Sequence, residues 1–241
     1  MGTATRFPWR IAMEWRDLLF AHWPVDPAAL RAALPQTEPR LELDLWEGHA
    51  WVGVVPFRMT GIRNRGLPPI PGTHAFPELN VRTYVKAGGR PGVWFFSLDA
   101  ASRLAVRVAR WTYHLPYFDA EMKCRSNERG QIEYRSRRTH RGGGTAELEV
   151  NYRPVGEPFS AAPGSLEHWL TERYRLFSAT PSGILYRGEI QHVPWPLQHA
   201  EAEFQNLNMT ESIGLTLPPI PPHLLFARFL SVRAAGLVRT V

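Results

Sequence analysis

Short runs of strand-forming residues, separated by loops rich in proline and glycine, constrain the fold of this chain more than any other feature. Such runs occupy residues 50–59, 79–85, 93–98, 132–138 and 145–152. Period-two alternation of polar and apolar side chains, with frequent turn residues, is typical of antiparallel β-sheet. The prolines and glycines are spread along the chain, and none of their clusters resembles a flexible interdomain linker. We therefore expect a single domain over residues 1–241.

Three other segments predict helices. Residues 27–34 follow Asp26, a good N-cap, and begin with a proline, which suits a first helical turn. Residues 102–112 and 165–177 each begin with serine and repeat apolar side chains at helical spacing. The predicted fold class is α+β: a large curved antiparallel sheet that closes into a barrel or cone, with a few helices packed on it. Closure would remove the edges of the sheet and leave an interior cavity.

Composition excludes several classes of protein. With 44% hydrophobic and 21% charged residues, the chain can bury a core and is not disordered overall. Its one cysteine, Cys124, allows neither an internal disulfide nor a zinc site of the finger type. We find no helical histidine pair for a metal, no phosphate loop and no dinucleotide fingerprint, so we expect neither metal nor cofactor. No apolar run reaches the ~20 residues that span a bilayer and no signal peptide is evident, so we expect a cytoplasmic protein without a membrane partner.

The basic side chains are almost all arginine. Of 28 basic residues only Lys86 and Lys123 are lysines, and the formal net charge is +6. Arginine binds carboxylates and phosphates through paired hydrogen bonds and keeps its charge at any working pH. A GC-rich genome would favour arginine as well. The scarcity of lysine leaves amine chemistry only two side chains.

The most informative stretch is FPELNVRTYV, residues 76–85. On a strand, Glu78, Asn80, Arg82 and Tyr84 share one face, and the other face is almost wholly apolar. One interpretation is a polar surface over an apolar core. The other is a polar row lining a pocket, in which Glu78 and Arg82, ~13 Å apart along an extended strand, face different ends of one ligand.

A second stretch, RWTYHLPYFDA at residues 110–120, leaves a helix and turns at Pro116 into a strand. Turns after helices often carry functional side chains, and the candidates here are His114 and Tyr117. A lone histidine near a helix end can equally be a solvated or capping residue. Tyr117 can equally be a core side chain.

Six motifs carry a family resemblance: VPFRM at 55–59, FPELNVRTYV at 76–85, GVWFFSLDA at 92–100, LPYFDA at 115–120, LTERY at 170–174 and HVPWPL at 192–197. In order and spacing they resemble the YqjF-like family of uncharacterised conserved proteins, which is similar in fold to acetoacetate decarboxylase. The resemblance spans nearly the whole chain. It implies a curved antiparallel β structure that encloses a pocket, and it carries no activity that can be transferred.

The resemblance also implies that this chain lacks the lysine pair of the acetoacetate decarboxylases. Acetoacetate decarboxylases form a Schiff base through a buried lysine that lies beside a second lysine. The resemblance places Tyr117 and Phe118 at those positions, and a tyrosine cannot form an imine. Strand alternation predicts that Lys123 faces solvent, and Lys86 is expected to be exposed beside a glycine turn. We therefore predict no Schiff-base decarboxylation, while the resemblance implies Glu78 as the counterpart of the decarboxylase pocket glutamate.

Our leading hypothesis is a pocket protein for a small anionic molecule. If it is an enzyme, it acts on an oxo acid or another small anionic substrate by lysine-independent chemistry: enolisation, dehydration, or a lyase or hydrolytic step. The catalytic candidates are Glu78, as general acid or base, and Tyr117, as a hydrogen-bond donor to a carbonyl. The substrate-binding candidates are Arg58, Asn80, Arg82, Tyr84 and His114.

Two alternatives stay open. In the first, the charges of the polar strand only hold the fold, with Arg82 paired to Asp99 and Glu78 paired to Arg58. In the second, the chain is a non-catalytic module that binds a ligand or, through the basic cluster at 135–141, nucleic acid. Acidic residues interspersed with arginine at 147–157 argue against nucleic acid. The sequence does not reveal the oligomeric state, and a homo-oligomer stays open.

Overall fold

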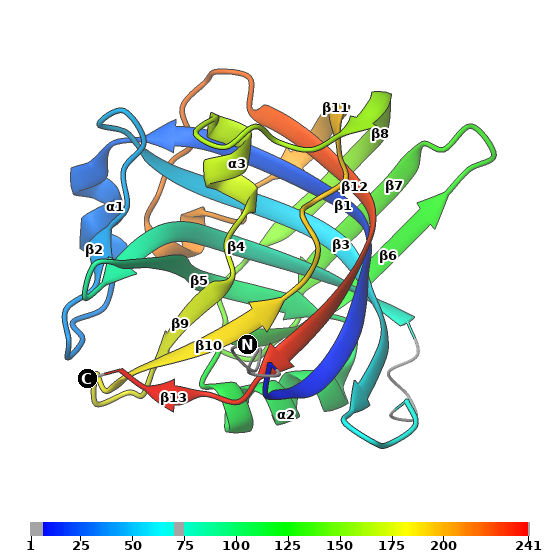
Figure 1. Cartoon of the computed structure of the whole chain (residues 1–241). Helices are drawn as coiled ribbons and strands as arrows, with labels where there is room; N and C mark the ends of the chain where they lie inside the picture. Colours follow the sequence, from blue (N-terminus) through cyan, green and yellow to red (C-terminus); the bar gives the residue numbers. More distant parts are fainter. Residues whose placement is uncertain (1–6, 70–74, 241) are drawn as a thin grey trace, which may run out of the picture.

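The computed structural model describes residues 7–69 and 75–240. This part of the chain forms one 13-stranded sheet with three short α-helices (Figure 1). All five predicted strand segments overlap observed strands. The strands are β1 (Trp9–Val25), β2 (Glu42–Leu43), β3 (Ala50–Asn64), β4 (Ala75–Ala87), β5 (Arg90–Ala100), β6 (Tyr117–Ser126), β7 (Ile132–Arg138), β8 (Glu147–Phe159), β9 (Arg175–Ala179), β10 (Leu185–Gln191), β11 (Leu197–Leu207), β12 (His223–Ala235) and β13 (Val238–Arg239).

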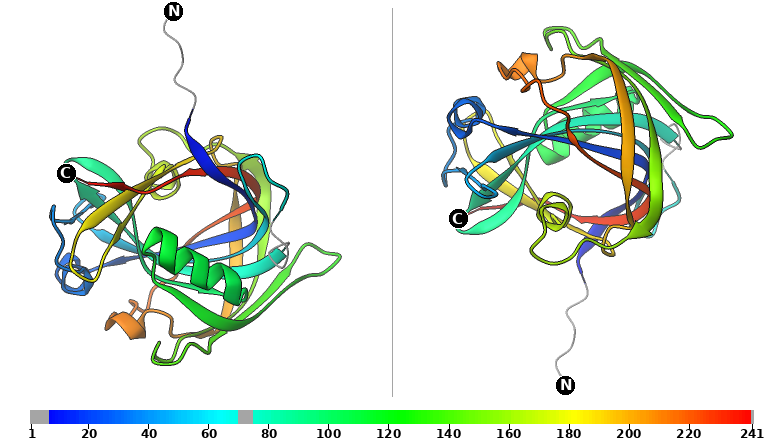
Figure 2. Two further views of the ribbon diagram at one scale, coloured as in Figure 1. Left: turned by 90° about the horizontal axis from the view of Figure 1, so that it is seen from below. Right: turned by 90° about the horizontal axis from the view of Figure 1, so that it is seen from above.

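The strand order is β13-β10-β9-β5-β6-β7-β8-β11-β12-β1-β3-β4-β2. Two additional pairings, β4 with β5 and β10 with β12, join strands that are distant in this order, so the sheet curls round on itself (Figure 2). Most neighbours are antiparallel, as predicted, but β5 pairs in parallel with both β6 and β9. A parallel pair needs a crossover connection, and a helix supplies it between β5 and β6. The prediction of an antiparallel sheet is therefore wrong at β5.

The three helices are α1 (Pro27–Ala33), α2 (Arg103–Tyr113) and α3 (Leu166–Thr171), followed later by the 3-10 turn η1 (Glu211–Ile213). Asp26 and Ser165 cap their helices as predicted, and Ser102 caps α2, because each side chain accepts a hydrogen bond from a first-turn N–H. The third helix is much shorter than the predicted 165–177. After Thr171 the chain forms β9, where Phe177 is buried and pairs with β5. Strand pairing with β5 has therefore outweighed the helical spacing of apolar residues in this segment.

Both faces of the central strands are covered by apolar side chains. One cluster packs Val52, Val54, Leu79 and Val81 with residues of β7 and β8, and the other packs Val55, Phe57, Phe76 and Tyr117 with residues of β1, β11 and β12. The polar row of β4 lies on the second face and is buried there: Glu78 is 2% exposed and Arg82 is 9% exposed. The interpretation of this row as a solvent-facing surface is therefore wrong.

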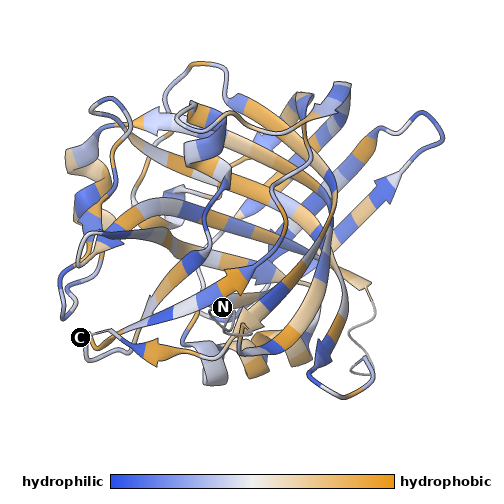
Figure 3. Ribbon diagram, in the orientation of Figure 1, coloured by the Kyte–Doolittle hydropathy of each residue, from blue (hydrophilic) through white to orange (hydrophobic). Residues whose placement is uncertain are grey.

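The strands β6 and β7 differ from the central strands in how their side chains are buried. Along β7, buried and exposed residues alternate strictly, and the same alternation of hydropathy is visible along β6 and β7 in Figure 3. One face of this part of the sheet is therefore solvated. Among the residues described, none of the helices has the length and apolarity that crossing a membrane requires.

Candidate functional site

Glu78 and Tyr117 meet inside the sheet. Glu78 lies in β4 opposite Phe57 of β3 and Ala100 of β5. The Tyr117 hydroxyl lies 3.2 Å from each carboxylate oxygen and donates to the carboxylate. Among the described residues, no arginine, lysine or histidine forms an ion pair with Glu78. The two predicted catalytic candidates are thus in direct contact.

The environment of Glu78 favours its neutral form. Its pKa is raised to about 8: burial is the largest cause, the hydrogen bond from Tyr117 lowers the pKa in part, and the negative charge of Asp99 adds to the rise. Burial, together with the neighbouring Glu78, also raises the pKa of Tyr117 well above its ordinary value. At neutral pH the pair therefore holds a proton that Glu78 can release or recover near pH 8, which is a suitable property for a general acid or base.

The turn between α2 and β6 positions Tyr117. His114 ends α2 in the left-handed conformation, with φ 48°, and Tyr117 then opens β6 beside Leu98 of β5. The Arg110 guanidinium donates to the Tyr117 carbonyl oxygen at 2.6 Å. The helix and the parallel strand pair together fix the backbone from which the phenol reaches Glu78.

Arg82 forms the centre of a second polar cluster on the same face of β4. Its Nη2 donates to the Tyr84 hydroxyl at 3.3 Å and to the Leu170 carbonyl at 3.4 Å, and its Nε is buried without a partner. The guanidinium lies 5.2 Å from the centre of the Phe20 ring. Within the described part of the chain no carboxylate pairs with it. Arg82 is a buried cation whose charge is not balanced.

His22 of β1 joins this cluster, and sequence reasoning missed it. The Tyr84 hydroxyl donates to the Leu170 carbonyl at 2.8 Å, so the His22 Nε2, 2.7 Å from the same hydroxyl, carries the proton and donates. Burial, and then the nearby charge of Arg82, lower the pKa of His22 well below its ordinary value. His22 is therefore neutral, with an unpartnered Nδ1 acceptor. The only signal in the sequence was one histidine within the apolar run of residues 18–25.

We call His22, Glu78, Arg82, Tyr84 and Tyr117 the β4 site. Aromatic rings surround it: Trp195 packs edge-on against Phe20 with ring centres 4.9 Å apart and stacks on Trp15 at 5.8 Å. Five buried polar atoms of the site and of its neighbours have no partner in the described residues: Trp15 Nε1, His22 Nδ1, Asn80 Oδ1, Arg82 Nε and Trp195 Nε1. Buried polar atoms are normally paired, which makes this cluster the candidate site.

Two predicted binding residues lie elsewhere. Arg58 points to the opposite face of β3 from Phe57 and, with Arg228, pairs with the buried Asp17. His114 lies at the end of α2, with its ring 5.3 Å from that of Tyr186. The structure therefore does not bring Arg58 or His114 into contact with Glu78, whereas Asn80 shares its strand face.

The ion pairs predicted under the structural alternative are wrong. Asp99 pairs with Arg138 through two hydrogen bonds of 2.8 and 3.0 Å, both side chains being fully buried, so it does not meet Arg82. Arg58 is engaged by Asp17 and does not meet Glu78. Asp99 and Asp17 thus pair with other arginines, which leaves Arg82 and Glu78 without charged partners among the described residues.

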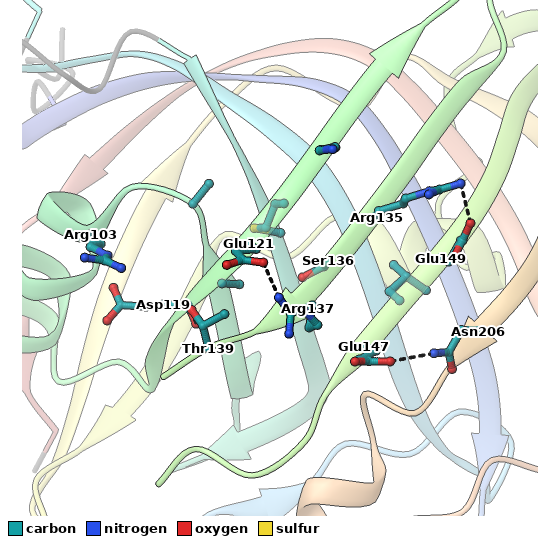
Figure 4. Close-up of a pocket in the computed structure, with 15 residues that line it drawn as sticks. Arg103, Asp119, Glu121, Arg135, Ser136, Arg137, Thr139, Glu147, Glu149 and Asn206 are labelled. Atoms are coloured by element: carbon teal, nitrogen blue, oxygen red, sulfur yellow. Dashed lines mark hydrogen bonds and ion pairs between the residues drawn. The ribbon is translucent and has the colours of Figure 1, made fainter. Parts of the chain in front are cut away.

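A groove of about 700 Å³ crosses the outer face of β6, β7 and β8 (Figure 4). We call it the charged groove. Its arginines and acids pair across the strands, Arg135 with Glu149 and Arg137 with Glu121, and Glu147 accepts from Asn206. These pairs engage Arg135 and Arg137 of the basic cluster proposed for nucleic acid.

The two lysines lie outside the β4 site. Lys86 pairs with Asp44 at 2.8 Å, and Lys123 is exposed on β6, as predicted. Among the described residues no group of three or more histidine, cysteine, aspartate or glutamate side chains is arranged to hold a metal ion. The polar chemistry of the interior therefore rests on Glu78, Tyr117 and the Arg82 cluster.

The fold is that of acetoacetate decarboxylase-like proteins. Acetoacetate decarboxylase from Legionella pneumophila subsp. pneumophila str. Philadelphia 1 matches with a TM-score of 0.65 at 14% identity, over 100% of this chain and 92% of that one. An acetoacetate decarboxylase-like enzyme from Sphingomonas wittichii RW1 gives 0.66 at 14% identity, over 99% and 98%. The enduracididine biosynthesis enzyme MppR, complexed with pyruvate, gives 0.65 at 15% identity, over 98% and 92%. At this identity the likeness concerns the fold alone.

Sequence comparison places the chain more narrowly. The model of the DUF2071 family, described as an uncharacterized conserved protein, matches residues 12–231, and the chain belongs to this family. The uncharacterized protein YqjF of Bacillus subtilis (strain 168) is 49% identical over 220 residues, which cover 91% of this chain and 88% of that protein. The resemblance drawn from the sequence motifs is confirmed.

Proposed function

We propose that this chain binds a small oxo acid in the β4 site and transfers a proton to or from it through Glu78, without an imine. The observation that carries the proposal is the charge balance of the site. Within the described residues Arg82 is buried without a carboxylate partner, while Glu78 and His22 are held neutral. A bound carboxylate would balance the guanidinium through paired hydrogen bonds.

The energetic argument favours a ligand over a structural role for Arg82. Leaving a buried charge without its partner costs about 3–5 kcal/mol, and a chain that needed only packing at this position would lose little by carrying an apolar residue there. Arg82 stacks near Phe20 and bonds only a hydroxyl and a carbonyl. Its unused Nε donor is the natural contact for an anion.

The proposed reaction is enolisation. As a carboxylate, Glu78 removes a proton from the carbon beside the ketone, the C–H electron pair forms the C=C bond, and the carbonyl oxygen becomes an enolate. The Tyr117 hydroxyl, now 3.2 Å from Glu78, donates to that oxygen. In the reverse direction the protonated Glu78 returns the proton to carbon. A pKa of about 8 makes both directions accessible near neutral pH.

Two further points support this function. Within the same fold, MppR has been seen with pyruvate, and an acetoacetate decarboxylase and an acetoacetate decarboxylase-like enzyme share the fold. The pairings of β4 with β5 and of β10 with β12 suit a barrel- or cone-like sheet that would enclose the β4 site as a pocket. Neither of the chain's lysines touches the site, which agrees with a reaction that forms no imine.

Deuterium exchange tests the proposal. Pyruvate in D₂O loses its methyl proton signal when a catalyst enolises it, and NMR follows the loss directly. We expect exchange that is faster above pH 8, is reduced by at least about 100-fold in Glu78→Gln, and is unchanged in the Arg137→Gln control on the outer face. Binding of pyruvate without any exchange would refute the catalytic step and leave the protein as a ligand carrier or sensor. If pyruvate and other oxo acids show no binding, the whole proposal fails.

A further inference from the structure

A second groove opens where β5 exchanges one neighbour for another. Along this edge, β5 pairs with β9 at Val93 and Trp94 and with β6 from Leu98 onward. Among the described pairings, residues 95–97 of β5 pair with neither β9 nor β6. The gap forms a groove of about 420 Å³, within the range of small-molecule sites. We call it the apolar groove. Its walls include Trp94, Phe95, Leu115, Pro116, Phe177 and Ser178.

Two residues of the groove wall are neighbours of the β4 site. Phe95 lies in the groove wall, and it also pairs in register with Arg82 and packs against the cluster that contains Tyr84. Leu115 lies in the groove wall and belongs to the buried cluster of Tyr117. Only two residues before Tyr117, Leu115 links the groove to the segment that holds the phenol on Glu78.

The chemistry of the groove differs from that of the β4 site. Most of its walls are aromatic, aliphatic or proline side chains, and the prolines offer no backbone donor. Four polar residues also line the groove. Arg110 already donates to the Tyr117 carbonyl, and the Thr180 hydroxyl bonds to Ser182 and to the Ile184 N–H. His114 lies at the end of α2, and Ser178 is 1% exposed with a hydroxyl that has no partner among the described residues. Such a surface suits a largely apolar group.

We propose that the oxo acid of the β4 site carries a bulky apolar side chain, aryl or branched alkyl, which the apolar groove holds past Phe95. This inference rests on the proposed function and narrows it. The carboxylate and ketone lie at Arg82 and Glu78, and the side chain lies between β5, β9 and the α2–β6 turn. A short acid such as pyruvate would fill only the polar part.

Calorimetric titration at neutral pH with pyruvate, 4-methyl-2-oxopentanoate and phenylpyruvate tests the inference. Burying a phenyl or isopropyl group should lower the dissociation constant at least about tenfold relative to pyruvate. Both larger acids should bind more tightly, and each should need Arg82. Equal affinity for all three acids would overturn this inference while leaving the proposed function intact. Absence of binding by any of them would overturn both.

A variant that obstructs the groove separates the two parts of the site. Pro35 is an exposed loop residue of the groove wall, and Pro221 is an exposed loop proline elsewhere. Pro35→Trp should weaken phenylpyruvate about tenfold or more and leave pyruvate unchanged, whereas Pro221→Trp should change neither. Circular dichroism establishes that both variants fold. Equal loss of both acids in Pro35→Trp, or no loss of either, would contradict the assignment of the groove.

Discussion

The outer face of β6–β8 and the interior beside β4 both carry arginines and acids, but they pair them differently. On the outer face Arg135 and Arg137 each meet a glutamate of a neighbouring strand. In the interior Arg82 meets no acid and Glu78 meets no base in the described residues. A solvated charge needs no partner, whereas a buried one does. The interior beside β4 needs charge pairing more than the outer face does, and yet it is the region without ion pairs. This is the physical reason to place a ligand there.

The ion pair of Arg138 and Asp99 extends this comparison, because both of its members are buried and each has a charged partner. Arg138 bonds both oxygens of Asp99 at almost no exposure. This sheet can therefore bury an arginine with a matching acid, and it does so one strand away from the β4 site. The lack of an acid beside Arg82 is thus a local property of that site.

Breaking the complete pair should have the largest effect. Arg138→Met leaves Asp99 buried without its partner, and we expect a loss of about 3–5 kcal/mol in unfolding free energy by urea denaturation. The double variant Arg138→Met with Asp99→Leu should recover most of the loss, since neither charge is then buried alone. A single variant as stable as wild type would show that the pair contributes nothing and would weaken the contrast with Arg82.

Glu78 should make stability depend on pH. Its pKa is about 8 in the folded protein and 4.5 ordinarily, so the folded state holds the extra proton between these values. The stabilisation is fully present below pH 4.5 and declines as pH rises, by about 1.4 kcal/mol per pH unit until pH 8. From pH 5 to 7.5 the decline should be about 3 kcal/mol. Glu78→Gln, measured by urea denaturation at each pH, should lack this slope. An identical slope in the variant would contradict the burial of an unpaired acid.

Arg82→Met should change stability little. The variant removes an unpaired buried charge and two long hydrogen bonds, and we expect an unfolding free energy within about 1 kcal/mol of wild type. The same substitution at Arg138 is the matched control, since both residues are buried arginines in strands. A loss at Arg82 as large as that at Arg138 would mean that the guanidinium serves the fold, and the proposed ligand would lose its main support.

The outer pairs should have the smallest effect. Arg137 and Glu121 are both largely exposed, and exposed pairs contribute about 0–1 kcal/mol. We expect Arg137→Ala to lower the unfolding free energy by less than about 0.5 kcal/mol, and salt at 1 M to remove the difference. A loss well above this value would show that the charged groove is a structural network.

The sequence predicted the strands and the polar row of β4 well, because alternation depends on local chemistry. The burial of that row could not be predicted, since it depends on apolar residues of β1, β11 and β12 that pack on the same face. Glu78 and Tyr117 were each predicted as candidates, but the contact between them was not. The turn after α2 was predicted, but the parallel pairing with β5 that brings Tyr117 to Glu78 has no sequence signature.

The misassigned partners have an equally physical cause. Arg58 meets Asp17 because β1 shifts register between Arg16 and Ala21, where Asp17 adopts a left-handed φ of 53°. An irregularity of this kind is not encoded in strand alternation. His22 was missed because its partners, Tyr84 and Leu170, lie far away in the chain. The sequence therefore did not allow us to predict which polar side chains pair across distant parts of the chain.

The most direct test of the account is a calorimetric titration of phenylpyruvate into three proteins: wild type, Arg82→Met and Arg137→Met. Both substitutions remove one positive charge, one from the β4 site and one from the outer face. The account predicts saturable binding to wild type and to Arg137→Met with similar affinity, and loss of binding in Arg82→Met, which remains folded. Equal binding to all three proteins would contradict the claim that the unpaired interior arginine is the receptor for the ligand.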